Sequence, residues 1–441
     1  MIDCRIASIA EIPTGWKQCR FKFLFKTRSG ITFTKAQIEE KGESVISYGQ
    51  IHSKDNNGVT VNPALVRFIP RALTEGHEEA LAYDGDFIFA DTSEDLEGCG
   101  NCICIDTEEP IYAGYHTFIA KKCHSECDRY LAYLFSCSSW RHQIRSMVNG
   151  IKVYSITQSI MKDVTIILPS LEEQLAIVSY LDECCAKMEE AITNHKRLIQ
   201  KLDEYRKAVI VKAITEGVRG DRKMKASGAN WIDSIPAGWD IVPLKSMFRF
   251  GKGLSITKAD LKETGNQVIS YGQIHSKSNR GVSVRPEFIR YVNDEAIEDN
   301  ALVPTNGFVF ADTSEDLEGC GNCVYNDISS PIYGGYHTIV LRPSKPANNK
   351  YLGYLFKTDT WRHQIRDALT DVKLFSISQK VLKNTSVIVP PADEQIEIVS
   401  FLDRKCASID SAQGIHAQLI TKLEEYKKSI INNAVTGKIK C

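Results

Sequence analysis

The sequence predicts an α+β fold in which two similar mixed α/β domains are joined by two long helices. These helices are expected to form an antiparallel coiled coil, with internal pseudo-two-fold symmetry. One observation behind this prediction is a repeat: residues 89–102 (FADTSEDLEGCGNC) return unchanged as residues 310–323, and residues 45–62 return as residues 268–285 with four differences. The other is that each copy ends in a long stretch whose apolar residues are spaced alternately about three and four apart, as in a coiled-coil helix.

The repeat is too long for a solenoid, whose units run to about 20–50 residues, because one copy fills half of the 441-residue chain. We therefore infer a tandem duplication of a whole module. The predicted organisation is a first domain (residues 1–169), a first helix (170–217), a linker (218–231), a second domain (232–390) and a second helix (391–437).

Short β-like runs separated by turn dipeptides predict the β part of each domain. In the first copy the runs are Val45–Ser47, Phe87–Phe89, Tyr115–Ile119 and Thr165–Leu168, with turns at Asn57-Gly58, Asp84-Gly85 and Asn149-Gly150. One helix is expected inside this domain, from near Tyr130 through Trp140 to Ile144.

The two long helices are predicted over Leu171–Glu216 and Ala392–Thr436. Ser170 and Glu173 have the spacing of a capping box, and Gly217 offers a C-cap. Because each domain enters its helix at the same end, a two-fold pairing of the helices must be antiparallel. The predicted seam consists of Leu171, Leu175, Val178, Leu181, Cys185, Met188, Ile192, His195, Ile199 and Leu202 in the first helix, and Ile396, Val399, Leu402, Cys406, Ile409, Gln413, His416, Ile420 and Leu423 in the second.

Composition indicates an ordinary globular protein, with 43% hydrophobic and 25% charged residues and a net charge of −1. No apolar run reaches the ~18 residues of a membrane span, and the first residues do not form a signal peptide. Ten of the 14 cysteines precede residue 220, so they did not duplicate with the module as a disulfide framework would have. Reduced thiols and a cytoplasmic location are expected.

Catalytic motifs are missing from the sequence. It contains neither a GxxxxGK[ST] phosphate loop nor the glycine-rich loop and Asn/Asp-Pro-Pro-aromatic site of a methyltransferase. The acidic segment Asp91–Glu97 would need a neighbouring Lys or His and a metal to act as a nuclease. Cys99 and Cys102 have zinc-knuckle spacing, yet zinc needs four ligands. We therefore expect a non-catalytic chain without cofactor or bound metal.

Several motifs resemble the specificity subunits of type I restriction–modification systems. Two of these motifs open the domains, at residues 12–16 (IPTGW) and 235–239 (IPAGW). Two more open the helices, at residues 167–174 (ILPSLEEQ) and 388–395 (IVPPADEQ). The resemblance covers essentially the whole chain. It implies two target-recognition domains and two modification (methyltransferase) subunits docked on the helix pair, with separate motor–nuclease (restriction) subunits. One departure is that the two domains here are near copies, whereas family members usually carry dissimilar ones.

Candidate contacts to double-stranded DNA lie in the repeated polar segments, because amide, hydroxyl, imidazole and ammonium groups suit base edges and phosphates. Gln50 and Gln273 could each pair with an adenine edge. The alternative for all of these side chains is that they serve the fold or face water. The candidates are Tyr48, Gln50, His52, Lys54, Thr92, Ser93, Glu94, Tyr115, His116 and Lys152 in the first copy, and Tyr271, Gln273, His275, Lys277, Thr313, Ser314, Glu315, Tyr336, His337 and Lys373 in the second.

The expected function is therefore recognition of a bipartite DNA site. Because the two candidate sets are nearly identical, the half-sites should form a near-palindrome, with centres about one helical turn apart. The alternatives are the corresponding subunit of a type IIB-like restriction enzyme, a metal-dependent nuclease, and a coiled-coil scaffold that binds no nucleic acid.

Overall fold

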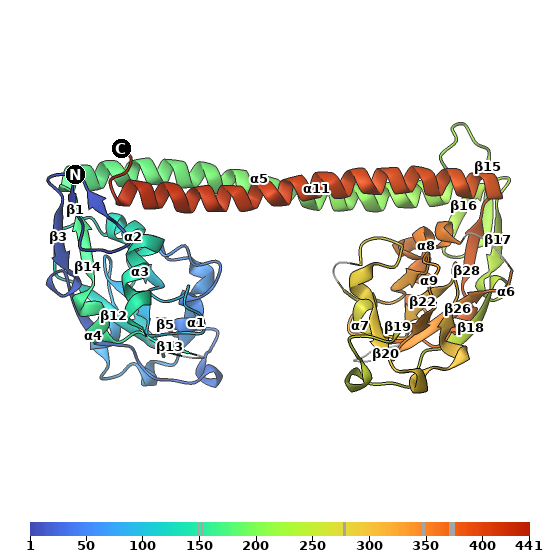
Figure 1. Cartoon of the computed structure of the whole chain (residues 1–441), viewed down its shortest axis with the longest axis horizontal. Coiled ribbons are helices and arrows are strands. Elements are labelled where there is room, and N and C mark those ends of the chain that lie inside the picture. Colours follow the sequence, from blue (N-terminus) through green and yellow to red (C-terminus); the bar gives the residue numbers. More distant parts are fainter. Residues whose placement is uncertain (149, 151–152, 277–278, 346–348, 370–374) are drawn as a thin grey trace. The chain divides into compact units, whose positions relative to one another are not determined.

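The computed structural model describes residues 1–441 except residues 149, 151–152, 277–278, 346–348 and 370–374. The chain divides into two compact units. The first unit comprises residues 1–196 and 417–441, and the second comprises residues 197–416. Each unit contains one globular domain and part of each of two long helices (Figure 1). None of the helices in the described part of the chain is long and apolar enough to cross a membrane.

Two four-stranded sheets form the centre of the first domain. The sheet with strand order β10-β8-β12-β4 is antiparallel, whereas the sheet with order β6-β5-β11-β7 joins β5 to β11 in parallel. All four residues of β8 are buried, which accounts for its continuous apolar sequence. The strands are β4 (Phe25–Ser29), β8 (Phe87–Ala90), β10 (Cys102–Cys104) and β12 (Thr117–Lys122), and β5 (Glu43–Ile46), β6 (Arg67–Ile69), β7 (Leu81–Ala82) and β11 (Ile111–Ala113).

The second domain repeats this topology strand for strand. Its sheets have the orders β18-β26-β22-β24 and β20-β19-β25-β21, again with one parallel pair, β19 and β25. The strands are β18 (Phe248–Lys252), β22 (Phe308–Ala311), β24 (Cys323–Tyr325) and β26 (Thr338–Pro343), and β19 (Asn266–Ile269), β20 (Arg290–Val292), β21 (Leu302–Val303) and β25 (Ile332–Gly334). The predicted mixed domains and their duplication are confirmed.

The single helix predicted inside the first domain is wrong, because two helices lie there. Cys137 is extended (φ −71°, ψ 130°) and separates α2 (Asp128–Ser136) from α3 (Ser138–Met147). The break allows Trp140 to enter the same core as α2, where its indole N–H donates to Thr165 O at 3.0 Å. The second domain has the same break between α8 (Lys350–Phe356) and α9 (Asp359–Arg366).

Short strand pairs and helices complete each domain. In the first they are β1 (Ile2–Asp3) with β2 (Glu11–Ile12), β3 (Lys17–Arg20) with β14 (Thr165–Leu168), β9 (Thr92–Ser93) with β13 (Tyr154–Ser155), and α4 (Gln158–Asp163). In the second they are β15 (Met224–Ala229) with β16 (Ile232–Pro236), β17 (Asp240–Pro243) with β28 (Ser386–Val389), β23 (Thr313–Ser314) with β27 (Phe375–Ser376), and the helices α6 (Leu244–Met247) and α10 (Gln379–Lys383).

Three predicted element bounds differ from the structure. The stretch 218–231 is not only a linker, because it contains β15. Ser47 was predicted to belong to a strand, but β5 ends at Ile46 and Ser47 caps the helix that follows. Tyr115 and His116 likewise precede β12, in the turn that leaves β11.

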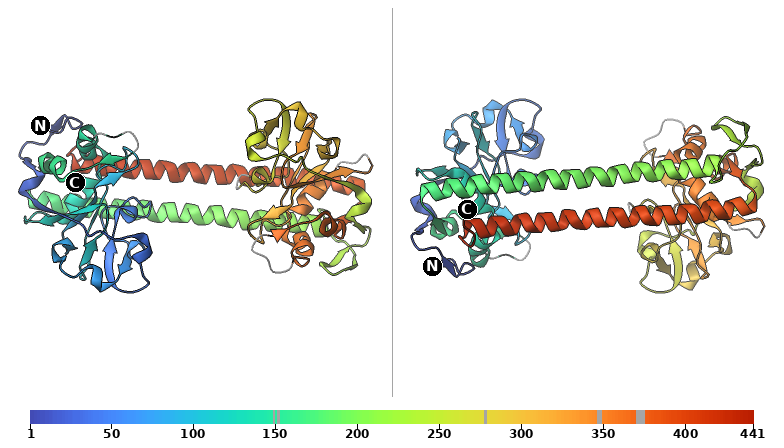
Figure 2. Two further views of the ribbon diagram at one scale, coloured as in Figure 1. Left: turned by 90° about the horizontal axis from the view of Figure 1, so that it is seen from below. Right: turned by 90° about the horizontal axis from the view of Figure 1, so that it is seen from above.

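The long helices are α5 (Leu171–Glu216) and α11 (Ala392–Val435). The predicted bounds of the first helix are confirmed, whereas the second helix ends one residue before the predicted Thr436. The Ser170 hydroxyl accepts from Glu173 N at 3.3 Å, and Gly217 has φ +79°, the left-handed conformation of a C-cap. Within each unit, the segments of α5 and α11 run side by side in opposite directions (Figure 2).

Part of the predicted seam is wrong at the start of each helix. Leu171, Leu175 and Ile396 are 50%, 54% and 66% exposed. The first turns instead face their own domain: Gln174 is fully buried, and its side chain accepts from Cys127 N at 2.9 Å. Further along, the seam is buried as predicted at Val178, Leu181, Cys185, Met188, Ile192, Leu402, Ile409 and Gln413.

Candidate nucleic-acid interface

The repeated polar segment forms a one-turn helix at the end of a buried strand. This helix is α1 (Tyr48–Ile51) in the first domain and α7 (Tyr271–Ile274) in the second. In each, a serine and a glutamine form a capping box: Gln50 Oε1 accepts from Ser47 N, and Gln273 Oε1 accepts from Ser270 N, both at 3.0 Å. A bidentate contact to adenine needs the amide oxygen as well as the amide nitrogen. The cap therefore competes with the contact predicted for these glutamines.

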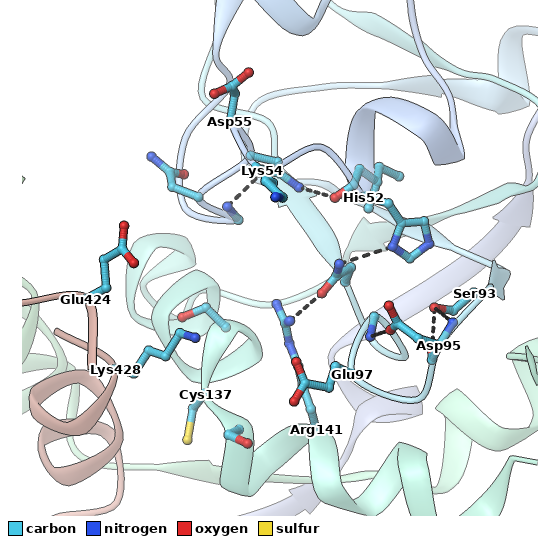
Figure 3. A pocket seen from close by; sticks show the side chains of 18 of the residues that line it. His52, Lys54, Asp55, Ser93, Asp95, Glu97, Cys137, Arg141, Glu424 and Lys428 are labelled. Atoms are coloured by element: carbon cyan, nitrogen blue, oxygen red, sulfur yellow. Dashed lines mark hydrogen bonds between the residues drawn. The ribbon is translucent and has the colours of Figure 1, made fainter. Parts of the chain in front are cut away.

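His52 binds two parts of its own domain. Its Nε2 lies 2.8 Å from Thr92 O, and its Nδ1 lies 3.1 Å from Asn101 Nδ2. Because the guanidinium of Arg141 donates to Asn101 Oδ1, the amide nitrogen of Asn101 is the group that donates to His52. A ring with its hydrogen on Nε2 satisfies both bonds of His52. His52 therefore positions α1 against the β9 segment. In Figure 3 the dashed line from the His52 ring runs to the amide of Asn101, which a second dashed line joins to Arg141.

His275 has the same two contacts in the second domain. Its Nε2 lies 2.8 Å from Thr313 O, and its Nδ1 lies 3.1 Å from Asn322 Nδ2. A direct DNA contact through the ring nitrogens of either histidine would require these bonds to break.

The acidic loop that follows β9 is held by its own side chains. Ser93 is 3% exposed and donates to Asp95 O at 2.7 Å, while Asp95 Oδ1 accepts from Gly98 N at 2.6 Å. Arg145 donates to Glu97 O at 2.7 Å. Ser314, Asp316 and Arg366 repeat this arrangement in the second domain. Of the loop candidates, Glu94 and Glu315 are exposed, Thr92 and Thr313 are half-buried, and Ser93 and Ser314 are buried.

Tyr115 and His116 lie in the turn between β11 and β12, beside α1. The ring of Tyr48 meets the rings of Tyr115 and His116 edge-on, with centroids 5.6 and 5.5 Å apart. Tyr271, Tyr336 and His337 form the same cluster at 5.5 and 5.4 Å. The structure thus brings together candidates from two segments that are more than sixty residues apart in the sequence.

A groove of ≈ 1430 Å³ in the first unit is lined by several of these candidates, namely Tyr48, His52, Lys54, Ser93 and Glu94 (Figure 3). Charges of both signs line it. The cations are Lys54, Arg141, Arg145, Lys427 and Lys428, and the carboxylates are Asp55, Glu94, Asp95, Glu97, Glu189 and Glu424. The groove wall is therefore not a uniformly basic surface. Lys152, Lys277 and Lys373 lie outside the described residues.

Sequence reasoning missed the groups that hold the candidates in place. Asn101 and Arg141 fix His52, and Asp91 lies beside His116. All three occur in segments that the second copy repeats, at Asn322, Arg362 and Asp312. Identity between the copies therefore also marks residues that hold the candidates in place.

The repeated cysteines lie in the domain cores. Burial raises the pKa of Cys102 to about 12 and that of Cys323 to about 11. A zinc ligand must be a thiolate, which these high pKa values oppose. In the described part of the chain, no three His, Cys, Asp or Glu side chains are grouped as a metal site.

Comparison with known proteins decides the family. The sequence model of the type I restriction modification DNA specificity domain matches residues 13–202 and again residues 236–424. The chain belongs to this family. The specificity-subunit resemblance is thereby confirmed, and the two matches fall on the two copies of the repeat.

Relatives and solved structures of the family agree along most of the chain. The StySPI specificity subunit of Salmonella potsdam is 23% identical over 443 residues, covering 97% of this chain and 90% of that one. The MjaVIII specificity subunit of Methanocaldococcus jannaschii is 24% identical over 307 residues, or 67% of each chain. A chain from a structural study of type I R-M complex assembly matches with TM-score 0.70 at 16% identity, covering 97% of this chain and all of that one. The HsdS subunit of Thermoanaerobacter tengcongensis matches with TM-score 0.52 at 16% identity, covering 97% and 98%.

These findings define the role of the chain. It is a non-catalytic DNA-recognition subunit of a type I restriction–modification system. The type IIB-like and nuclease alternatives are not favoured. Two recognition domains joined by long paired helices are the fold of the family's specificity subunits.

Proposed function

We propose that each domain reads one half of a bipartite, near-palindromic DNA site. The observation that carries this proposal is the agreement between the two candidate surfaces. Tyr48, His52 and His116 have the same neighbours, at distances within 0.2 Å, as Tyr271, His275 and His337. Domains that present the same groups in the same geometry bind the same base pairs, and two-fold-related readers produce an inverted repeat.

Two substitutions could still make the half-sites unequal. Asn57 closes its own loop by accepting from Val59 N and Thr60 N at 2.8 and 3.0 Å. The second copy has Arg280 there, whose guanidinium lies 3.5 Å from Gln413 Oε1 and 3.8 Å from Asp203. Arg285, which replaces Asn62, pairs with Glu287 at 2.9 Å. We expect differences between the half-sites to arise from residues 57–62 of the first domain and residues 280–285 of the second.

Two modification (methyltransferase) subunits and motor–nuclease (restriction) subunits are the proposed protein partners. The support is that the relatives are named as subunits of type I restriction enzymes and that one structural match comes from a study of complex assembly. We place the complex in the cytoplasm. All 14 cysteines are free thiols, which fits a reducing compartment.

Methylation-sensitive sequencing of the host genome, with and without this gene, tests the proposal. The expected result is one gene-dependent motif with two specified halves in inverted repeat around an unspecified spacer. Each mismatch should cost about 1–3 kcal/mol in binding by the purified complex. A motif with two unrelated halves would show that specificity lies in the diverged segments. No gene-dependent motif, together with no DNA binding at low salt, would overturn the proposal.

A further inference from the structure

Two histidines adopt a backbone conformation that residues other than glycine rarely take. His116 and His337 both have φ +54°, the left-handed region that favours glycine. They occupy equivalent positions in the β11–β12 and β25–β26 turns. A side chain in this region costs on the order of 1 kcal/mol, and such strain persists where the surrounding structure fixes it.

Backbone hydrogen bonds fix the turn. Asp91 N donates to His116 O at 3.1 Å, Tyr48 N donates to Tyr115 O at 3.3 Å, and Thr117 donates to Gly114 O at 2.7 Å. The three corresponding bonds of the second domain measure 3.1, 3.4 and 2.7 Å. Glycine would accept this backbone without strain. The presence of histidine in both copies therefore points to a use for the imidazole.

The imidazole is exposed, and its Nδ1 edge lies beside a carboxylate. His116 Nδ1 lies 3.5 Å from Asp91 Oδ1, and His337 Nδ1 lies 3.3 Å from Asp312 Oδ1. Both carboxylate oxygens are buried and make no hydrogen bond within the described structure. The histidine side chains are 60% and 57% exposed. No hydrogen bond joins Nε2 of either ring to the residues that the structure describes, so this nitrogen remains available to a ligand.

We propose that His116 and His337 contact the DNA target, each donating Nε2–H to a phosphate oxygen or to guanine O6 or N7. The inference rests on the proposed function and assigns these residues their role in it. The groups facing the His116 ring are the Asp91 carboxylate and the rings of Tyr48 and Tyr115.

The test replaces both residues by asparagine, which tolerates the left-handed backbone but lacks the imidazole. The complex of the double variant H116N/H337N with the modification subunits is compared with the parent complex. The melting temperature should be unchanged or higher, because the strain is relieved. Affinity for the mapped target should fall about tenfold or more. The matched control is His77→Asn, since His77 lies 3.6 Å from Glu79 and is 54% exposed but has φ −122°.

Two outcomes of this comparison identify the acceptor. Loss of affinity on all sequences, with a salt dependence weakened by about one unit per contact, would assign a phosphate. Loss on the target alone, reproduced by 7-deazaguanine, would assign guanine N7. A double variant that binds like the parent overturns the inference, whereas a parent that binds no target overturns the proposed function as well.

Discussion

Glu189 of α5 and Lys427 of α11 form an ion pair in the first unit, with 2.6 Å between carboxylate oxygen and ammonium nitrogen. In the second unit Arg206 of α5 pairs with Asp410 of α11 at 2.5 Å. By the register of the repeat, Asp410 corresponds to Glu189 and Arg206 to Lys427. In the first unit α5 supplies the carboxylate and α11 the cation, whereas in the second unit α11 supplies the carboxylate and α5 the cation. Each unit therefore contains the same helix pairing.

The buried seam should not tolerate charge. Leu181 and Leu402 are both fully buried, so L181D/L402D would place two carboxylates in apolar surroundings at a cost of at least about 3 kcal/mol. We expect loss of soluble, assembled protein in a co-purification with the modification subunits. The matched control is L175D/I396D, at predicted seam positions that the structure exposes. Normal assembly of the first double variant would contradict the helix pairing.

The glutamine of each capping box should contribute to stability. Replacing Gln50 and Gln273 by alanine removes the acceptor for Ser47 N and Ser270 N, and each replacement should cost about 1 kcal/mol. Glutamate keeps an acceptor at the same position, so Q50E/Q273E should retain stability in urea unfolding. Equal destabilisation by both pairs of substitutions would contradict the capping role. A stable Q50E variant with relaxed discrimination in one half-site would support the predicted adenine contact.

More of the fold than of the candidate site could be predicted from the sequence. Duplication and spacing indicate two domains and two long helices, because both are periodic signals. Burial of Gln174 in place of Leu175 was not predictable, since it depends on which face of α5 meets the domain. The same limit applies to His52 and His116: both are polar residues in repeated segments, but His52 binds Thr92 and Asn101 while His116 faces solvent. Only the tertiary neighbours distinguish a positioning side chain from an available one.

Lys357 should make the stability of the second unit depend on pH. Its ammonium group is enclosed and donates to Asn279 O and Oδ1 at 3.1 Å, and burial lowers its pKa from 10.5 to about 8. Below pH 8 the lysine is charged in both folded and unfolded states, and the folded state bears the desolvation penalty. Between pH 8 and 10.5 only the unfolded state holds the proton, so stability should rise with pH, by up to about 3 kcal/mol.

The first domain supplies the control for this prediction, because it has Ser136 where the second has Lys357. Stability is measured by urea unfolding at several pH values for the parent and for Lys357→Ser. The difference between the two isolates Lys357 from the tyrosines and cysteines that titrate in the same range. A constant difference across pH 7–10.5 would show that the ammonium is not desolvated.

Half of the chain should form a symmetric dimer. The core of the first unit includes Ile431, Ala434 and Val435 from the end of α11, and the Tyr130 hydroxyl donates to Val435 O at 3.5 Å. The end of α5 provides the equivalent groups to the second unit: Ile210, Ala213 and Ile214 enter its core, and Tyr351 donates to Ile214 O at 3.1 Å. A fragment of residues 1–220 therefore carries both a domain that lacks these core residues and a helix end that can supply them to another copy.

We expect this fragment to be an isologous homodimer at micromolar concentration, measured by analytical ultracentrifugation. Ile214→Asp should prevent dimerisation, because Ile214 is fully buried in the intact chain. Leu198→Asp is the control, since Leu198 lies on the same helix but is 42% exposed. Each domain of the dimer would be identical, so its target should be a perfect inverted repeat of the half-site read by the first domain. A folded, monomeric fragment would show that the domain does not need the helix end to complete its core.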